Sequence, residues 1–370
     1  MEKKGFAIFL FFLITVAVLT SVAGINNVTA LNNRKVVIDV SHGQGPSDGN
    51  WTGNKLEAIM ANFEGNLTLK GLEVVWATEL NESVLADAQF LFLGSVYQSD
   101  LSDADVMVIV NWFVQGEKTI WVAGDSDYAQ SPTPDLMNKV LRAIGSKIRV
   151  EPTSVEDPIT NCAGAYRVRA NVTNNDDSEV AGIVAGVNAT KGILFHGPTV
   201  LYGFVNGVAV PLETTNIENV HWVMRTGGSG IIVDSDVITN PPRAHEAGQQ
   251  GSFVMMAVEK YAGPNGDCKI IVSGENPYGG YQPMYSPEYY GYPMDGPTLV
   301  MNTVDWGLDI ESEADVIDDL MNQLETELSE LHDEVHTLSS DIESLRTLLY
   351  AAFGVAIVGL IIGIVAVIRK

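Results

Sequence analysis

A run of residues without charge near the C-terminus constrains this chain more than any other feature. No charged side chain lies between Thr347 and Ile368, and a helix of that length covers roughly 33 Å, enough to cross the hydrocarbon core of a bilayer. We predict a transmembrane helix over 348–368. Arg369 and Lys370 follow at once, so the positive-inside rule makes 369–370 a cytoplasmic tail and places the rest of the chain outside.

The N-terminus has the pattern of a secretory signal peptide. Lys3 and Lys4 precede an apolar stretch from Gly5 to Val18, and small residues follow it. We predict that residues 1–23 are a signal peptide, with cleavage after Ala30 or an uncleaved signal anchor as alternatives. In each case we expect a single-pass type I protein of the cell membrane, with an extracellular or lumenal ectodomain.

Six N-x-[ST] sequons lie in the part of the chain that this topology places outside. They begin at Asn27, Asn50, Asn66, Asn81, Asn171 and Asn188. We therefore predict a glycoprotein. Because short sequons also arise by chance, the alternative is that several are never modified.

A heptad repeat precedes the C-terminal apolar run. Leucine occupies the d positions, and two of the four a positions hold β-branched residues, a combination that favours a parallel two-stranded coiled coil. The d residues are Leu324, Leu331, Leu338 and Leu345, and the a residues are Leu328, Val335, Ile342 and Leu349. We predict a stalk over 312–349, about 55 Å long, that pairs two copies of the chain. The alternatives are a helix packed on its own ectodomain, or an acidic stalk that pairs with a basic partner.

The net charge of the chain argues against a nucleic-acid partner. The chain has 21 basic and 46 acidic residues, which give a net charge of -25, the wrong sign for binding nucleic-acid phosphates.

The two cysteines, Cys162 and Cys268, lack the CxxC spacing of zinc and redox motifs. Both lie in the exported part, where free thiols oxidise, so we predict one disulfide between them.

Residues 34–308 have the pattern of an α/β ectodomain. Short β-branched runs alternate with helical patterns, as in a parallel sheet with helices on both faces. The expected strands are Lys35–Val40, Leu72–Ala77, Phe90–Leu93, Thr119–Ala123, Tyr166–Val172, Gly192–Phe195, His221–Arg225, Gly230–Val233, Ser252–Val258 and Lys269–Val272. The expected helices are Lys55–Asn62, Ala104–Gln115 and Asp135–Ile144.

Four segments of this ectodomain resemble the class I glutamine-amidotransferase-like superfamily. They are VVIDVSHGQG (Val36–Gly45), Leu101–Asp127, GILFHG (Gly192–Gly197) and CKIIVSGE through NTVDW (Cys268–Trp306). That superfamily includes GldG-type auxiliary proteins of ABC transporters, an intraflagellar-transport subunit and the non-catalytic subunit of oligosaccharyltransferase. The resemblance implies a flavodoxin-like parallel-sheet fold and a non-enzymatic binding or scaffold module.

The sequence lacks the nucleophile of an active amidotransferase. That chemistry needs a cysteine on a strand-to-helix elbow, activated by a histidine and oriented by a carboxylate. The comparable loops read Gly94-Ser95-Val96 and Gly124-Asp125-Ser126-Asp127, and no GxSxG is present. We therefore expect no amidase activity and name no catalytic residue.

Polar residues nevertheless follow three of the expected strands, at the edge where parallel sheets bind ligands. These ligand-binding candidates are Asp39, Ser41, His42, Ser95, Asp125, Ser126 and Asp127. We expect no cofactor, although together these residues could hold a divalent cation or hydrogen-bond the hydroxyls of a sugar. The alternative is that Asp39 and Asp125 cap turns and helix N-termini.

A tyrosine-rich segment, Pro277–Pro293, is the other binding candidate. Its six tyrosines stand among glycines and prolines that prevent regular structure. Exposed tyrosines suit contact with protein or glycan, and the alternative is a self-packed loop over a sheet edge.

These patterns together predict a membrane-anchored glycoprotein that serves as a binding or scaffold accessory subunit of a membrane or envelope complex. We expect the membrane, a second copy of the chain or a partner coiled coil, other envelope proteins and glycans as its contacts. One alternative is a metal-assisted surface hydrolase or sugar-processing enzyme that uses the strand-end residues. The other is a structural stalk protein of the cell envelope.

Overall fold

The computed structural model describes residues 34–44, 54–96, 101–235, 238–279, 282–310 and 313–368. They form two compact units that divide after Ile310. We call the first unit the head; the second is one helix, α9 (Glu313–Ile368). The predicted signal peptide, the sequons at Asn27 and Asn50, and the 369–370 tail lie outside the described residues.

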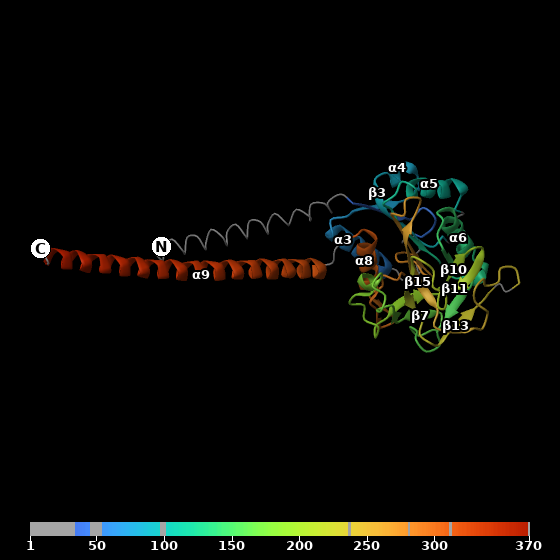
Figure 1. The fold of residues 1–370 in the computed structure, drawn as a ribbon. Helices are drawn as coiled ribbons and strands as arrows, with labels where there is room; N and C mark the ends of the chain where they lie inside the picture. The colour runs from blue at the N-terminus through green and yellow to red at the C-terminus, as the bar shows by residue number, and fades with distance from the viewer. Residues whose placement is uncertain are drawn as a thin grey trace. The chain divides into compact units, whose positions relative to one another are not determined.

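Within the described residues, an eight-stranded sheet forms the centre of the head, in the order β2-β1-β3-β4-β16-β15-β12-β8 (Figure 1). Its strands are β1 (Lys35–Asp39), β2 (Glu73–Ala77), β3 (Ala88–Leu93), β4 (Thr119–Ala123), β8 (Val172–Thr173), β12 (Val220–Arg225), β15 (Val254–Ala262) and β16 (Cys268–Ser273). The strands from β2 to β16 run parallel, which confirms the expected class. The last three strands pair antiparallel with their neighbours, and for β15 and β16 the short connection permits only a hairpin.

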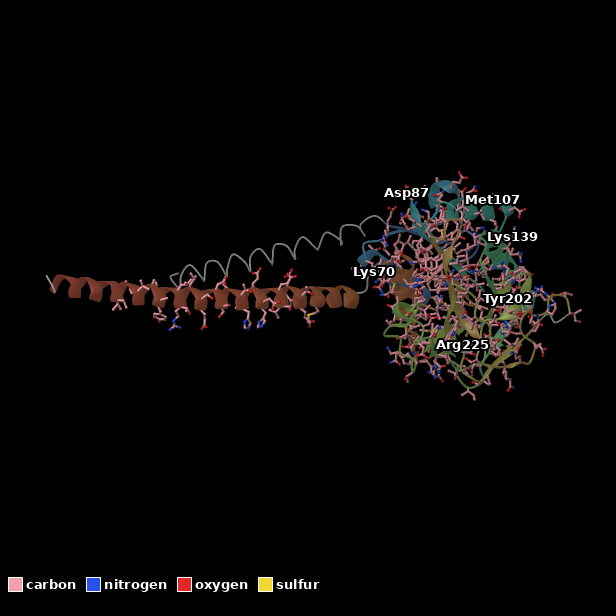
Figure 2. The ribbon with its side chains drawn as sticks, viewed as in Figure 1. Lys70, Asp87, Met107, Lys139, Tyr202 and Arg225 are labelled. Atoms are coloured by element: carbon pink, nitrogen blue, oxygen red, sulfur yellow. The ribbon has the colours of Figure 1, made fainter. Side chains whose placement is uncertain are left out.

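Helices cover both faces of this sheet. Successive residues of a strand point to opposite faces, so Ile38 packs on one side and Val37 on the other. The Ile38 side meets α3 (Asn54–Leu69), α7 (Ala181–Val184) and α8 (Gly296–Gly307). The Val37 side meets α4 (Glu82–Leu85), α5 (Asp103–Phe113) and α6 (Thr133–Ala143). Figure 2 shows side chains filling the space between these layers.

Smaller sheets join the head at the carboxyl end of the parallel strands. One is β11-β10-β5, a second is β14-β13-β6, β7 pairs with β9, and β17 with β18. Their bounds are β5 (Ile148–Val150), β6 (Ser154–Glu156), β7 (Arg167–Ala170), β9 (Ile193–His196), β10 (Leu201–Val205), β11 (Val208–Pro211), β13 (Gly230–Val233), β14 (Gln250–Gly251), β17 (Glu288–Tyr289) and β18 (Tyr292–Pro293). The expected strand Tyr166–Val172 is thus divided: β7 belongs to one sheet and β8 to another.

Helix α9 keeps its apolar side chains exposed. The described heptad residues Leu324, Leu331, Leu338 and Leu345 are 60%, 41%, 60% and 65% exposed. Among the described residues, α9 is also the helix that is long and apolar enough to cross a membrane, over Leu324–Leu360. That one helix carries both the expected stalk and the expected span.

The predicted disulfide is wrong. Cys162 and Cys268 are both free and buried. Cys162 packs with Leu194 and Met294, whereas Cys268 belongs to a different core cluster, which includes Phe113. The prediction rested on an expected oxidising compartment, but a bridge also requires the two Cβ atoms to meet, and this fold puts the thiols into separate clusters.

Candidate functional site

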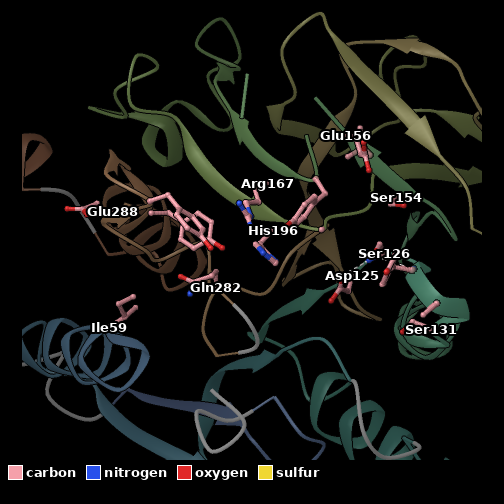
Figure 3. A pocket seen from close by; sticks show the side chains of 17 residues that line it. Ile59, Asp125, Ser126, Ser131, Ser154, Glu156, Arg167, His196, Gln282 and Glu288 are labelled. Carbon is pink, nitrogen blue, oxygen red and sulfur yellow. Dashed lines mark hydrogen bonds between the residues drawn. The ribbon is translucent and has the colours of Figure 1, made fainter. Parts of the chain in front are cut away.

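A cleft of about 1010 Å³ opens at the carboxyl end of the central sheet (Figure 3). Asp125 and Ser126, which follow β4, form part of one wall, and Glu156 at the end of β6 lies near them. Residues from β7, β9 and the β17–β18 hairpin form the opposite wall. Elements far apart in the sequence therefore make this site.

Pairing between β7 and β9 sets the chemistry of that second wall. Arg167 and His196 are direct cross-strand partners in the antiparallel register, so their side chains emerge on the same face. In the short β17–β18 hairpin Tyr289 pairs with Tyr292, and Tyr289 and Tyr290 of this hairpin also line the cleft.

Tyrosine rings surround the guanidinium of Arg167. Its central carbon lies 4.7 Å from the ring centre of Tyr166, 4.5 Å from that of Tyr290 and 5.8 Å from that of Tyr289. The Nη1 group makes one long hydrogen bond, 3.4 Å, to the carbonyl of Ala163. The Nε atom is buried and has no hydrogen-bond partner among the described residues. Aromatic rings thus hold the cation while much of its hydrogen-bonding capacity stays unused.

His196 is a neutral ring in this wall. Burial, with a contribution from the charge of Arg167, lowers the pKa of His196 to about 4. Its ring makes edge contacts with Tyr166 at 5.5 Å and Tyr289 at 5.8 Å between centroids. His196 ends an apolar strand, and its pairing with Arg167 is what brings it to the cleft.

A buried carboxyl group lies behind the cleft. Glu275 follows β16, and its carboxylate accepts the backbone N–H groups of His196 at 2.8 Å and Asn276 at 2.7 Å. Burial, and then the charge of Asp125, raise the pKa of Glu275 well above its usual range. The backbone before Glu275 passes close to Thr199, and only glycine fits at position 274, since a Cβ there would lie 2.0 Å from the carbonyl oxygen of Thr199. Sequence reasoning missed Glu275, although it lies within one of the segments that resemble the amidotransferase-like superfamily.

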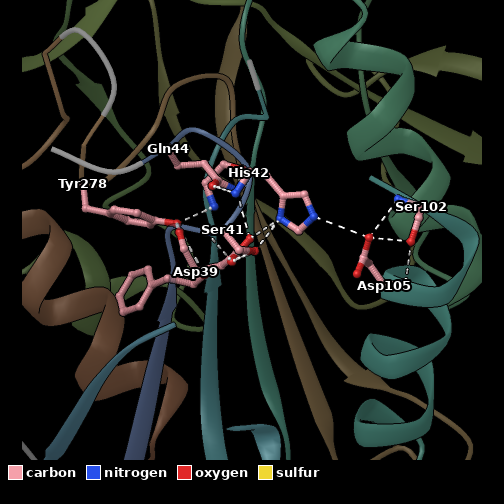
Figure 4. Close-up of polar contacts among 9 residues, drawn as sticks. Asp39, Ser41, His42, Gln44, Ser102, Asp105 and Tyr278 are labelled. Carbon is pink, nitrogen blue, oxygen red and sulfur yellow. Dashed lines mark hydrogen bonds and ion pairs between the residues drawn. The ribbon is translucent and has the colours of Figure 1, made fainter. Parts of the chain in front are cut away.

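The first group of predicted site residues forms a separate network (Figure 4). The buried Asp39 carboxylate accepts the Ser41 N–H at 3.0 Å and the Gln44 amide at 3.0 Å, and it lies 2.9 Å from Nδ1 of His42. On its other side, Nε2 of His42 lies 3.5 Å from Asp105, which caps α5. Burial alone would lower the pKa of His42, but the two carboxylates outweigh it and raise the pKa. Asp39 therefore orders its own turn.

The predicted residues do not converge in one cleft. Asp125 and Ser126 line it, whereas Asp39, Ser41, His42, Ser95 and Asp127 are not part of its lining. The Ser95 hydroxyl donates to the carbonyl of Gly124 at 2.6 Å. Asp127 accepts the Ser235 N–H at 3.2 Å, and burial raises the pKa of Asp127. Across the described part of the chain, no three His, Cys, Asp or Glu side chains are placed to hold a metal ion.

The tyrosine-rich segment is divided between the two roles expected for it. Tyr278 and Tyr285 are buried, and the Tyr278 hydroxyl donates to the carbonyl of Asp39 at 2.5 Å. Tyr290 is 63% exposed at the cleft. The first pair packs the loop against the head, and the hairpin tip supplies contact surface.

The described sequons differ in how their amides are engaged. Asn66 donates from Nδ2, the atom that would carry a glycan, to the Tyr285 hydroxyl at 2.5 Å. Asn81 caps α4 through its side-chain oxygen, and the Asn188 oxygen accepts the Thr190 N–H. Asn171 is half-buried.

Comparison with known proteins adds a fold similarity. No family model and no curated protein matches the chain. The N-terminal domain of mmIFT52 is similar over 75% of this chain and 98% of that domain, with 11% identity and a TM-score of 0.48. A ThuA-like protein from Bacteroides uniformis is similar over 75% of this chain and 93% of its own, with 9% identity and a TM-score of 0.38. Both have class I glutamine amidotransferase-like folds, and neither similarity assigns a residue role or an activity to this chain.

Proposed function

We propose that this chain is a membrane-anchored binding subunit whose head recognises a ligand in the tyrosine-lined cleft. The cleft is the observation that carries the proposal. It lies at the sheet edge where α/β folds bind ligands, and it combines aromatic rings with a small set of polar side chains.

The serines of the cleft support binding over nucleophilic catalysis. Ser126 accepts a hydrogen bond from the Tyr128 N–H, Ser131 pairs with Thr133, and Ser154 donates to the carbonyl of Val233. These bonds use the hydroxyl groups in local turns and strands. Burial raises the pKa of Cys162 to about 11 and also raises that of Cys268, so neither thiol is an activated nucleophile.

Helix α9 supplies the anchor and the pairing surface in this proposal. Its C-terminal part crosses the membrane and holds the head outside, at the cell surface or in a lumen. A second copy of the chain covers the exposed heptad face, since leucine at d with β-branched residues at a suits a parallel pair. The protein then acts as an accessory subunit that binds envelope proteins or their glycans.

Photo-crosslinking in native membranes tests the binding role. Full-length protein with benzoylphenylalanine in place of Tyr290 should give a covalent adduct on illumination. The same substitution at Tyr261, which is 64% exposed and outside the cleft lining, is the matched control and should give none. Equal adducts at both positions, or none at Tyr290, would contradict the proposal and favour a structural stalk protein.

A further inference from the structure

The cleft contains one cation without an ionic partner. Arg167 is the single basic side chain among the described residues that line it, against the carboxylates of Asp125, Glu156 and Glu288. Among the described residues, no ion pair within 4.0 Å joins Arg167 to an acidic group. A guanidinium that is neither neutralised nor solvated on its faces is prepared to bind an anionic group in its plane.

The tyrosines fix the orientation of this cation. The ring centres of Tyr166 and Tyr290 lie 4.7 Å and 4.5 Å from its central carbon, so the rings enclose the guanidinium. Its Nη1 group makes one long hydrogen bond of 3.4 Å, so the terminal N–H groups are the donors that remain for a ligand. Figure 3 shows Arg167 beside His196 in the middle of the cleft. A planar donor pair in this setting matches a carboxylate in two-point contact.

The remaining lining limits the ligand to one negative charge. Three carboxylates in the same cleft and a net charge of -25 repel a polyanion such as a nucleotide. Those carboxylates and Gln282 are instead suited to accept hydrogen bonds from hydroxyl groups. The rings of Tyr128 and Tyr290, 77% and 63% exposed, offer flat apolar surface to the C–H face of a sugar ring.

We infer that the cleft binds an oligosaccharide that contains a single uronic acid, with Arg167 holding the carboxylate of that unit and the tyrosines packing on neighbouring neutral sugar rings. This inference names the ligand of the binding role proposed above and rests on that role. A cleft of about 1010 Å³ is large enough for more than one sugar ring.

Titration calorimetry with a matched pair of probes tests the ligand class. The full-length protein is kept in a detergent without a sugar head group, and the probes are an aldotriouronic acid, a trisaccharide with one uronic acid unit, and its methyl ester. The acid should bind at least about tenfold more tightly than the ester, because the ester lacks the anion that Arg167 would hold. Equal affinity for the two probes, or binding of neither, overturns the inference.

Substitutions assign the effect to named side chains. Arg167→Gln should remove the preference for the acid over the ester. Arg167→Lys should lower the affinity for the acid by roughly tenfold, because a point charge replaces the planar guanidinium. Tyr290→Phe keeps the ring and should leave affinity nearly unchanged. Arg169→Gln is the matched control: Arg169 lies on the same strand against Tyr292, outside the lining, and should bind as wild type. An Arg167→Gln variant that still prefers the acid overturns the inference.

The outcomes separate this inference from the binding role. If neither probe binds but the Tyr290 position still gives its photo-adduct, the ligand class is wrong and the binding role stands. An adduct that contains only peptide would identify a protein ligand instead. Should Arg167→Gln fail to fold, the acid and ester comparison on the wild type remains decisive.

Discussion

The head and α9 differ in the exposure of their apolar side chains. In the head, Phe92 and Trp121 are completely buried by residues of the same chain, and their rings stack at 5.5 Å. In α9, Leu331 and Leu345 remain 41% and 65% exposed. Burial of apolar area is the main driving force of folding, so the head holds the contacts that stabilise it, whereas the described heptad residues of α9 make no such burial within the chain.

Disruption of the heptad face should have the largest effect. Leu331→Asp with Leu338→Asp places charges at two d positions in each copy, and each loss of a buried leucine costs about 2–5 kcal/mol. We expect complete conversion of a dimer to monomers in analytical ultracentrifugation. Ser340→Asp, at an f position, is the control and should stay dimeric. A wild-type monomer would show that the face is covered by something other than a second copy.

Removal of a ring from the head should be the next largest effect. Phe92→Ala leaves a cavity among Phe63, Phe90 and Trp121 and should lower the free energy of unfolding of the head by about 3–5 kcal/mol. Chemical denaturation followed by tryptophan fluorescence measures the loss. Met107→Ala, an exposed change on α5, should have little effect. If Phe92→Ala also abolished pairing through α9, the two units would not be independent.

A buried histidine should make the head sensitive to alkaline pH. Burial alone would lower the pKa of His245, but hydrogen bonds and charges from Glu151 and Glu213, 3.0 Å and 3.2 Å away, raise it to about 9. Because this value lies above the unfolded one, the stabilisation is complete below about pH 6.5 and is lost as pH rises through about 9.

The loss should be about 3 kcal/mol in the free energy of unfolding, measured by urea titration between pH 7 and 10. A His245→Gln variant should show a flatter dependence over the same range. An identical pH dependence in wild type and variant would contradict the assignment to His245.

The cysteines should give the smallest effect. With no disulfide to open, reductant should leave the melting temperature of the head unchanged. Intact-mass analysis without reductant should find two labelled thiols after denaturation and none in the folded protein, since Cys162 and Cys268 are both buried. Absence of label in the denatured, unreduced protein would show that the two cysteines are joined by a disulfide.

Most of the regular structure could be predicted because its signals are local. Expected strands Lys35–Val40 and Thr119–Ala123 appear as β1 and β4 within one residue at each end. The expected helix Asp135–Ile144 appears as α6, which starts two residues earlier. The three-residue strand β5 was missed, because a run that short carries little periodic signal.

The candidate site was predicted only in part. Strand ends located Asp125 and Ser126, since side chains that follow a buried strand reach the sheet edge. The same rule also selected Asp39 and Ser95, whose side chains are used by Asp39's own turn and by the carbonyl of Gly124. A strand-end position predicts the edge that a residue reaches, and it does not predict whether a local partner takes up its side chain.

The sequence by itself determined the features that depend on spacing along the chain: the alternating strands of the head, the heptad face and the apolar length of α9. The tertiary structure decided which distant residues meet. It placed Arg167 opposite His196, set Glu275 beside Asp125, and separated Cys162 from Cys268. These contacts follow from strand order and register, with β16 inserted beside β4 about 150 residues away. Register is fixed by the packing of the whole core, so no local pattern specifies it.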